Sequence, residues 1–413
     1  MAYPGAEAAY LHIIRDEKFI DAARALFESA APGLHRFVVV GAPGPFVHLK
    51  TFVPEIVPLE QATGPAFLGQ LARSRVVFLH GLSHAARWIV SRAPASTRFV
   101  WIGWGGDYYH LIRPGDELLL PETRALVAGL REARYRARWL RRLRIACNVL
   151  WRPWSWPAFL ARLRMDRDLR RLGPGMGGEA ALLAKISLFA PVLREEYGLL
   201  TEAHPGFGPG LAEWNYDINQ SLEHARRAQA PALGDNILLG NSATPENNHA
   251  DAFALMGELG GRTVVCPLGY GDASYASAIR QLGKETLGQH FHPLADFVPA
   301  LQYADLMRSC GIVVMNHRRQ QALGTINAAL CNGAKVFLRP ENPLHAFYRS
   351  LGVQIFSVDE LRSHLGADAP ALDDTQVAHA RTAIDANFGP AALQRKTRRL
   401  LEACEALPRK HAD

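Results

Sequence analysis

Residues 312–345 read IVVMNHRRQQALGTINAALCNGAKVFLRPENPLH and give the clearest indication of the architecture. Two short apolar runs, 312–315 and 335–338, have the length and apolar character of strands that are buried on both faces of a parallel sheet. The residues between them predict a polar loop and then a short helix, which begins near Gly324 and ends before Gly333. Strand, helix and strand in this order predict a βαβ unit.

The same alternation extends over the rest of the chain. Further buried strands are predicted at 37–40, 76–79, 99–102, 237–239, 263–266 and 354–356. Helices are predicted at 19–28, 122–131 and 180–197. Because 413 residues are enough for two domains, we predict an α/β protein with two doubly wound, Rossmann-like halves across a cleft. The predicted halves are residues 1–230 and 231–413.

Composition places the chain among globular proteins of a reducing compartment. It is 48% hydrophobic and 21% charged, which is far from disordered or fibrous compositions. The five cysteines form no C-x-x-C pair and leave an odd one over, so a disulfide framework is not expected. The N-terminus lacks the features of a signal peptide, and no run of about 18 apolar residues occurs. We therefore expect a cytoplasmic protein without a membrane-spanning segment.

Positive charge is concentrated in one segment, residues 131–171, which holds 13 arginines and three acidic residues. The whole chain carries +7, so the remainder sums to −3. The segment also contains Trp139, Trp151, Trp154 and Trp156, and Pro153 and Pro157 divide it into two short predicted helices. Arginine mixed with tryptophan is typical of a helix that rests on an anionic membrane. A helical hairpin packed on the first domain is the alternative. A nucleic-acid surface is also conceivable, but the net acidic remainder contains no nucleic-acid module, so no nucleic acid is expected.

Polar residues follow several predicted strands of the second half. Ligands of open parallel sheets bind beyond the carboxyl ends of the strands, where a helix N-terminus offers unpaired N–H groups. At Gly324 the backbone can approach a phosphate, and Arg318 and Arg319 can neutralise its charge. Glu341 can accept hydrogen bonds from sugar or ribose hydroxyls. An ordinary helix start with a solvated arginine pair and a turn remains the alternative.

Two other strand ends in the second half have a similar form. Gly240 frees the backbone, and Asn241 and Ser242 can either donate to a phosphate or cap a helix. Tyr270, in the turn that starts at 267, can either stack on a base or pack within its loop.

In the first half, His80 ends one predicted strand, and the loop 103–108 follows the next. This loop has three glycines, one aspartate and two large aromatic residues, so Asp107 is our candidate for general base. A structural turn in which Asp107 caps the next helix is the alternative. Asp166 and Asp168 match a D-x-D metal motif, but they lie among arginines, so we interpret them as solvated charge pairs on a helix. No metal site is expected.

In these residues the chain resembles the transferases that add 4-acetamido-4,6-dideoxygalactose (Fuc4NAc) from its TDP donor to lipid II of the enterobacterial common antigen, the 4-alpha-L-fucosyltransferase family. The resemblance is dense in the second half and thin in the first. The matching segments are His12-Ile13-Ile14, His80-Gly81, Trp104-Gly105-Gly106-Asp107-Tyr108, Leu239-Gly240-Asn241-Ser242, Asn248-His249, Pro267-Leu268-Gly269-Tyr270, Arg319-Gln320-Gln321, Gly324-Thr325 and Glu341-Asn342-Pro343.

The resemblance implies a GT-B glycosyltransferase that needs no metal or other cofactor. The second half would bind the TDP-sugar, and the first half would bind a polyprenyl-diphosphate-linked saccharide. The residues implied at the diphosphate are Gly240, Asn241, Ser242, Gly324 and Thr325, with Arg319 as counter-charge. Glu341 and Asn342 are implied at sugar or ribose hydroxyls, and Gly269, Tyr270 and Gln320 complete the implied donor site.

For the reaction, Asp107 is the first candidate base and His80 the second. In a second interpretation of His80, its ring is only hydrogen-bonded inside the sheet edge. The resemblance implies that the protein is located at the cytoplasmic face of the inner membrane and takes part in the synthesis of a surface polysaccharide. Two alternatives stay open: a related transferase with a different nucleotide sugar, and a non-catalytic scaffold of the same fold that binds glycan or membrane.

Overall fold

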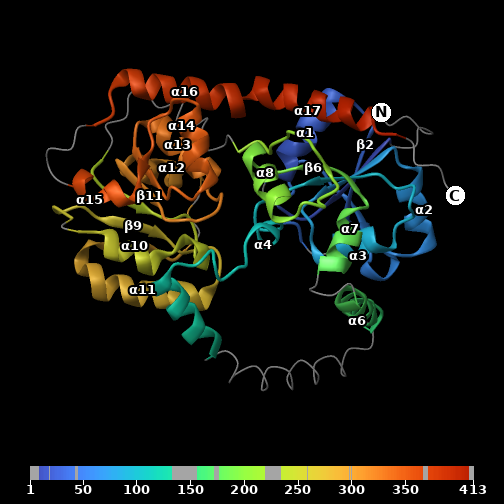
Figure 1. The fold of residues 1–413 in the computed structure, drawn as a ribbon, viewed down its shortest axis with the longest axis horizontal. Helices are drawn as coiled ribbons and strands as arrows, with labels where there is room; N and C mark the ends of the chain where they lie inside the picture. The colour runs from blue at the N-terminus through green and yellow to red at the C-terminus, as the bar shows by residue number, and fades with distance from the viewer. Residues whose placement is uncertain are drawn as a thin grey trace. The chain divides into compact units, whose positions relative to one another are not determined.

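The computed structural model describes residues 9–17, 19–41, 45–132, 156–171, 176–218, 234–257, 259–296, 298, 300–365 and 371–408. The chain divides into two compact units. The first unit comprises Met1–Ile112, Arg141–Asp217 and Pro390–Asp413, and the second comprises Arg113–Leu140 and Ile218–Gly389. Figure 1 shows the elements of each unit.

The first unit contains a seven-stranded sheet in the order β3-β2-β1-β4-β5-β6-β7, in which every neighbouring pair is parallel. The predicted strands at 37–40, 76–79 and 99–102 are confirmed within it. The strands are β1 (Tyr10–Ile14), β2 (His35–Val40), β3 (Glu55–Val57), β4 (Val76–His80), β5 (Phe99–Ile102), β6 (Ile186–Ala190) and β7 (Gly210–Leu211).

The first unit also contains eight described helices. They are α1 (Ile20–Ala30), α2 (Pro65–Arg73), α3 (His84–Arg92), α4 (Tyr109–Ile112), α6 (Trp156–Arg171), α7 (Met176–Leu183), α8 (Arg194–Ala203) and α17 (Pro390–Glu405), with a 3-10 turn η1 (Leu59–Gln61). Helix α1 buries Ile20, Ala23 and Phe27, the spacing of a single helical face. It packs beside α17, whereas α3 packs against α6 and α7 (Figure 1).

The second unit contains a six-stranded, all-parallel sheet in the order β10-β9-β8-β11-β12-β13. This is the strand order of a dinucleotide-binding fold, and it reverses direction between β8 and β11. The predicted strands of the second half are confirmed, with shifts of one or two residues at two of them. The strands are β8 (Ile237–Leu239), β9 (Val264–Pro267), β10 (Phe291–Leu294), β11 (Ile312–Met315), β12 (Lys335–Leu338) and β13 (Phe356–Ser357).

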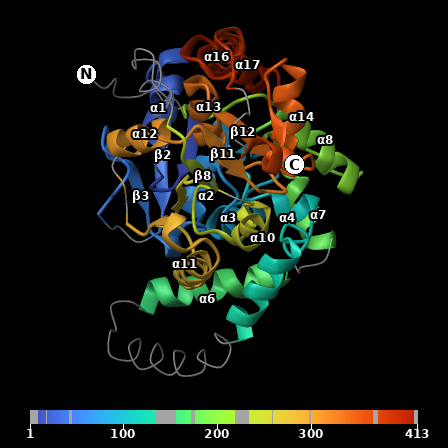
Figure 2. The same ribbon diagram turned by 90° about the vertical axis from the view of Figure 1, so that its left-hand side faces the viewer.

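The helices of the second unit form a layer on each side of its sheet. Figure 2 shows α12 and α13 on one side and α10 and α11 on the other. Residues 121–132 form a further helix. The others are α10 (His249–Leu255), α11 (Ala273–Leu287), α12 (Ala300–Arg308), α13 (Leu323–Asn332), α14 (Pro343–Ser350), α15 (Leu361–His364) and α16 (Asp374–Phe388), with 3-10 turns η3 (Pro245–Asn247), η4 (Gly288–His290) and η5 (Val358–Glu360).

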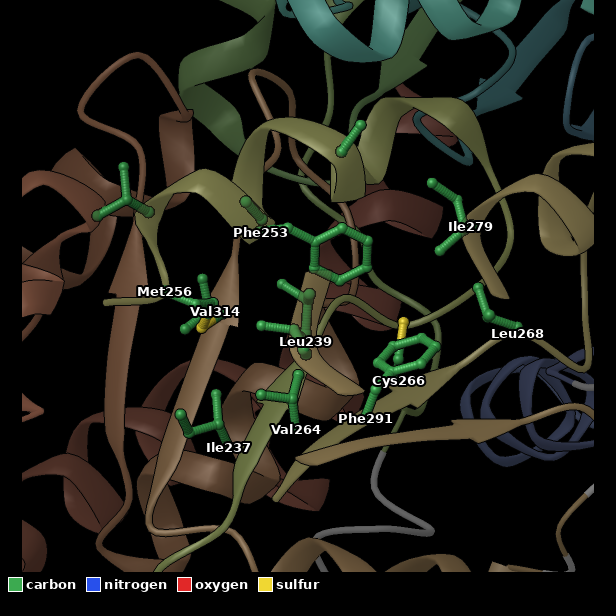
Figure 3. Packing of buried hydrophobic residues seen from close by; sticks show 14 of the residues in the cluster. Ile237, Leu239, Phe253, Met256, Val264, Cys266, Leu268, Ile279, Phe291 and Val314 are labelled. Carbon is green, nitrogen blue, oxygen red and sulfur yellow. The ribbon is translucent and has the colours of Figure 1, made fainter. Parts of the chain in front are cut away.

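One face of the second sheet is packed by a continuous apolar cluster (Figure 3). Ile237 and Leu239 of β8 and Val314 of β11 contribute from the sheet, and Phe253 of α10 and Ile279 of α11 cover them. Each of these side chains is almost fully buried, and burying such a side chain contributes about 1.5–3 kcal/mol. This core fixes the positions of the strand ends from which the polar loops emerge.

The two units do not follow the predicted boundary between residues 230 and 231. The second unit begins near residue 218 and also includes 113–140, because Asn248 and Asp251 hold the start of the helix at 121–132. Helix α17 returns to the first unit, where Thr397 accepts a hydrogen bond from Trp214 at 2.9 Å.

The predicted helix at 180–197 is wrong. The chain forms α7, then strand β6, then α8 over this stretch. Residues 186–190 pair in parallel with β5. Local sequence patterning suggested a helix here because it carries no information on this pairing. Most of the cationic segment, residues 133–155, lies outside the described residues, and so does the first helix of the predicted pair. The remaining stretch of the segment forms helix α6 from Trp156.

Candidate active site

The loops at the carboxyl end of the second sheet are tied together by Asn247, a fully buried side chain. Its Oδ1 accepts hydrogen bonds from the backbone N of Asn241 at 2.9 Å and from Nε2 of His317 at 2.8 Å. Its Nδ2 donates to Oγ1 of Thr244 at 2.8 Å. The loop after β8 is thereby joined to the loop after β11, on the two sides of the point where the strand order reverses. Open α/β sheets bind ligands at this position.

Gly240 meets a backbone requirement in this network. Its φ is +68°, and a Cβ there would lie 2.6 Å from Oδ1 of Asn247 and 2.7 Å from Nε2 of His249. Both the left-handed conformation and the close approach require glycine. The glycine that was predicted to free the backbone after β8 is therefore required by the conformation of the loop itself.

Gln321 makes a second link between the same two loops. Its Nε2 donates to Oδ1 of Asn241 at 2.9 Å and to Oγ1 of Thr244 at 3.0 Å. Ser242 and Gln320 are buried, whereas Asn241 is partly exposed. Of the predicted ligands in these loops, Asn241 is the side chain best placed to meet a solute.

The helix predicted near Gly324 and Thr325 is α13, and it begins at Leu323. Its C-cap is Gly333, as predicted, with φ +86°. Its N-cap residue, Ala322, has a left-handed conformation with φ +63° and offers no side-chain cap, so the first-turn N–H groups receive no side-chain acceptor from the cap. A helix N-terminus in this state favours an anion.

Charged groups lie in the loops after β11 and β12, at the same end of the sheet. Glu341 accepts a hydrogen bond from Nη2 of Arg339 at 3.0 Å and lies 3.7 Å from Nε of Arg318. Burial raises the pKa of Glu341, but these arginines outweigh it and hold the pKa below its ordinary value. Glu341 is therefore an ionised hydrogen-bond acceptor. Nη1 of Arg319 donates to the carbonyl of Gln320 at 2.9 Å, so the Arg319 side chain lies along the loop after β11.

Asn342 has a different place from the one predicted for a hydroxyl ligand. It is fully buried, and its Nδ2 donates to the carbonyls of Arg319 at 2.9 Å and His317 at 3.2 Å. Its Oδ1 caps α14 by accepting from the N of Leu344. Its observed contacts support the loop that carries Arg319, and a contact with a sugar stays a prediction.

Tyr270 is the exposed aromatic side chain of this loop cluster, with 78% of its surface accessible. Its carbonyl accepts from the N of Ala243, so it lies beside the loop after β8. Gly269 and Gly271 fix the turn, because a Cβ on either would lie 2.6 Å from a backbone atom of a neighbouring loop. Of the two interpretations of Tyr270, packing within the loop does not fit this exposure.

In the first unit, the carboxylate of Asp107 is hydrogen-bonded to other groups of the protein. Its carboxylate accepts from the N of Leu82 at 2.9 Å, from Nε1 of Trp101 at 2.8 Å and from the N of Trp104 at 2.7 Å. Burial raises its pKa, and these hydrogen bonds act in the opposite direction. The carboxylate ties the loop after β4 to the loop after β5 and does not cap α4. Its role as base stays a prediction, but the oxygens are occupied in this arrangement.

His80 also has both ring nitrogens in use. Nδ1 lies 2.8 Å from the hydroxyl of Tyr216, and Nε2 lies 3.0 Å from Nδ1 of His12, whose Nε2 lies 2.9 Å from His35. Burial lowers the pKa of His80 to about 3, so the ring is neutral near pH 7. These contacts match the interpretation in which His80 is hydrogen-bonded inside the sheet edge.

Asp168 is not a solvated charge, which corrects the interpretation of the D-x-D motif. It is buried, and its Oδ2 accepts from Nη2 of Arg92 at 2.6 Å and from Nε1 of Trp88 at 3.1 Å. The pair fastens α6 to α3. Within the described part of the chain, no group of three His, Cys, Asp or Glu residues is arranged to hold a metal ion.

Sequence reasoning missed Asn247, His317 and Gln321 as the residues that build the loop cluster. Amide and imidazole side chains carry no motif of their own, and their partners are up to 80 residues away. Tyr216 was missed for a similar reason, because its partner His80 lies 136 residues away in the chain.

Solved structures identify the fold. Sucrose-phosphate synthase from Thermosynechococcus elongatus aligns with a TM-score of 0.57 at 11% identity, covering 96% of this chain and 99% of that one. Anabaena HepE, solved with UDP and glucose, aligns with a TM-score of 0.57 at 13% identity, covering 97% and 100%. A glycosyltransferase from Rickettsia africae aligns with a TM-score of 0.55 at 10% identity, covering 97% and 99%. The chain has the GT-B fold, with two Rossmann-like units.

The sequence itself points to a narrower group. The pattern of the family described as 4-alpha-L-fucosyltransferase glycosyl transferase group 56 matches residues 216–404. This range contains every loop of the second-unit cluster. With the GT-B fold, the match identifies the chain as a glycosyltransferase.

Proposed function

We propose that the protein transfers a deoxyaminosugar of the Fuc4NAc kind from a TDP-sugar to a lipid-linked saccharide during synthesis of a bacterial surface polysaccharide. The observation that carries the proposal is the family match over residues 216–404, because it covers the loops after β8, β9, β11 and β12 together. HepE, which has the same fold, was solved with UDP and glucose, and this supports a nucleotide-sugar donor here.

The chemistry of the second-unit loops supports a nucleoside diphosphate as ligand. The first turn of α13 presents N–H groups, and Arg319 lies in the loop before it, a combination that stabilises a diphosphate both when bound and when it leaves. Tyr270 offers an exposed ring for a base. Glu341, held ionised by its arginines, suits ribose or sugar hydroxyls.

Thermal unfolding with nucleotides tests the donor site. We expect TDP to raise Tm more than UDP does, because binding to the native state alone stabilises it. Arg319→Ala and Tyr270→Ala should each remove most of the TDP-induced shift. Arg308→Ala is the matched control, because Arg308 pairs with Asp305 on α12 and should leave the shift intact. Equal shifts with TDP and UDP would contradict the thymidine assignment, and no shift with either would contradict a nucleotide-sugar site.

Helix α6 supports a place at the cytoplasmic face of the inner membrane. Its face toward the protein holds Ala161, Met165 and the Asp168–Arg92 ion pair. Outside this face, 44% of Leu160 and 48% of Leu163 are exposed, and so is Arg164. Exposed leucine with arginine suits an anionic lipid surface, to which each basic residue contributes about 1 kcal/mol. None of the helices in the described part of the chain combines the length and apolar character needed to cross a bilayer.

Vesicle sedimentation tests this membrane contact. We expect the protein to sediment with vesicles of phosphatidylglycerol and phosphatidylethanolamine, and the doubly substituted Leu160→Asp, Leu163→Asp variant to remain largely in the supernatant. Charge reversal of the arginines in 131–171 should have the same effect and leave the TDP-induced Tm shift unchanged. Leu34→Asp is the control, because Leu34 is similarly exposed but precedes β2. Unchanged sedimentation of both α6 and segment variants would contradict the membrane proposal.

A further inference from the structure

The first sheet also has a point at which its strand order reverses, between β1 and β4. The loop that follows β1 carries Glu17 and Phe19 and lies at the carboxyl end of one of these strands, and His80 ends the other. Loops at such a point are where open α/β sheets bind their ligands. The first unit therefore has a candidate ligand position of its own, independent of the donor loops.

Three aromatic rings lie together at this position. The ring of Trp104 lies 4.3 Å from that of Tyr216 and 5.8 Å from that of Phe19, and Phe19 lies 6.2 Å from Tyr216. Phe19 and Trp104 are partly exposed. Small-molecule sites are lined largely by aromatic side chains with a few polar groups that set orientation. We name Phe19, Trp104 and Tyr216 the aromatic shelf.

Three carboxylates of the loops that carry Phe19 and Trp104 differ in their hydrogen bonding. Asp16 accepts from the backbone N of Val47, His48 and Leu49 at 2.6 to 2.9 Å. Asp107 accepts from three donors, as described above. The carboxylate of Glu17 is partly exposed and makes no hydrogen bond or ion pair with any residue that the structure describes. Of these three, Glu17 has its oxygens available for a substrate proton.

Glu17 is also close to the shelf. Its backbone carbonyl accepts from the N of Ile20 and so starts α1, which places Phe19 against Trp104. Burial raises the pKa of Tyr216 well above its ordinary value, and the nearby Asp107 and Glu17 carboxylates raise it further. The Tyr216 hydroxyl is therefore a neutral hydrogen-bond donor and acceptor near the Glu17 carboxylate.

We propose that the aromatic shelf seats the sugar of the acceptor and that Glu17 takes the proton from its attacking hydroxyl. The inference rests on the proposed glycosyl transfer. The acceptor oxygen forms a bond to the anomeric carbon as its proton passes to the Glu17 carboxylate. The bond from that carbon to the phosphate oxygen breaks, and its electron pair leaves with the nucleoside diphosphate. Atoms and charge balance without a further reactant.

His80 then has a supporting part. It holds the Tyr216 hydroxyl at 2.8 Å, and His12 holds its other nitrogen at 3.0 Å. Both imidazoles are buried and their facing nitrogens are hydrogen-bonded to each other, so His80 is a positioning residue for the shelf and not the group that meets the acceptor.

Steady-state transfer kinetics test the inference, with a TDP-sugar donor and a polyprenyl-diphosphate-linked disaccharide in detergent. Removing a general base costs about 100-fold or more, so Glu17→Gln should lower kcat by at least that factor and leave the KM for the donor unchanged. Glu17→Asp should recover part of the rate. Trp104→Leu should raise the KM for the acceptor about tenfold or more and change the donor KM less than twofold.

Glu213→Gln is the matched control, because Glu213 is near Tyr216 in sequence but pairs with Arg194. It should keep kcat within about twofold. The inference is overturned if Glu17→Gln keeps more than a tenth of the kcat, or if Glu213→Gln loses as much. Absence of turnover in the unaltered protein overturns the proposed function, and the inference with it. The two failures are therefore distinguishable.

Discussion

The two sheets reverse their strand order in the same way but present different side chains at that point. In the second unit the loops after β8 and β11 carry amides and a guanidinium group, including Asn247, Gln321 and Arg319, beside the N-terminus of α13. In the first unit the loop after β1 carries Glu17 and Phe19, and the loops after β5 and β7 add Trp104 and Tyr216 to the aromatic shelf. Topology fixes where a ligand binds, and side chains fix which ligand it is.

The difference teaches which substrate each unit suits. N–H donors and a cation stabilise an anionic group such as a diphosphate. A carboxylate beside aromatic rings suits a neutral ligand with hydroxyl groups, one of which must lose a proton. The same difference predicts unequal responses to substitution, because the amide network is buried and interlocked, whereas Glu17 is partly exposed.

Asn247→Ala should have the largest effect on stability. It leaves the N of Asn241 and Nε2 of His317 without their shared acceptor, and each unpaired buried group costs about 1–3 kcal/mol. We expect a loss of about 4 kcal/mol in the free energy of unfolding, measured by urea denaturation with circular dichroism, and loss of the TDP-induced shift. Glu17→Gln should change stability by less than about 0.5 kcal/mol. Equal losses in the two variants would remove the contrast between the units.

Gly240→Ala should cost about 3 kcal/mol. The left-handed φ of +68° is unfavourable for alanine, and the added methyl would overlap Asn247 and His249. Gly106→Ala, in the loop of the first unit, is the control, because a Cβ there meets nothing within 4 Å. Its effect should stay within about 0.5 kcal/mol. A tolerated Gly240→Ala would show that the donor loop is not interlocked.

Acid should destabilise both units through buried histidines. Burial lowers the pKa of His80 and His249 to about 3 and that of His35 to about 4. Burial also lowers the pKa of His12 in the first unit and of His317 in the second, so both units contain such histidines. A folded-state pKa below the unfolded value means that the unfolded chain binds the proton first. Stability is therefore complete above about pH 6.5 and is lost as the pH falls toward 3.

At pH 5.5 the expected loss is on the order of 1 kcal/mol for each such histidine. Hydrogen exchange followed by mass spectrometry at pH 7 and 5.5, corrected for the intrinsic rate, should show a loss of protection in peptides from β1 and β4 and in peptides from β8 and β11. Unchanged protection in all four strands would contradict the buried, neutral state of these rings.

Ala322→Gly should have the smallest effect, and it should be stabilising. Ala322 has a φ of +63° at the N-cap of α13, where glycine avoids the steric cost of the left-handed conformation. We expect a gain of about 0.5 kcal/mol in urea denaturation. Ala329→Gly, inside the same helix, should instead lose about 1 kcal/mol. A loss in Ala322→Gly would show that the backbone relaxes before α13.

Much of the fold was predictable because buried parallel strands appear in the sequence as short apolar runs. Strands β4, β5, β11 and β12 were found in this way. Strand β1 was not, because His12 interrupts its apolar run, and β6 was taken for part of a helix. Of the candidate site, the loops were predicted at the correct strand ends. The contacts of Asp107 and His80 were not, because their hydrogen-bond partners come from other loops and strands.

The order of apolar runs and breakers was enough to establish two doubly wound halves and to place glycines, amides and arginines at strand ends. Local patterning suffices for this, because a strand buried on both faces must be apolar whatever its neighbours are. Assembly alone settled that α17 returns to the first unit and that Asp107 is occupied by hydrogen bonds while Glu17 is not. Whether a polar group is satisfied depends on partners that are distant in the chain, and these meet only once the sheets have formed.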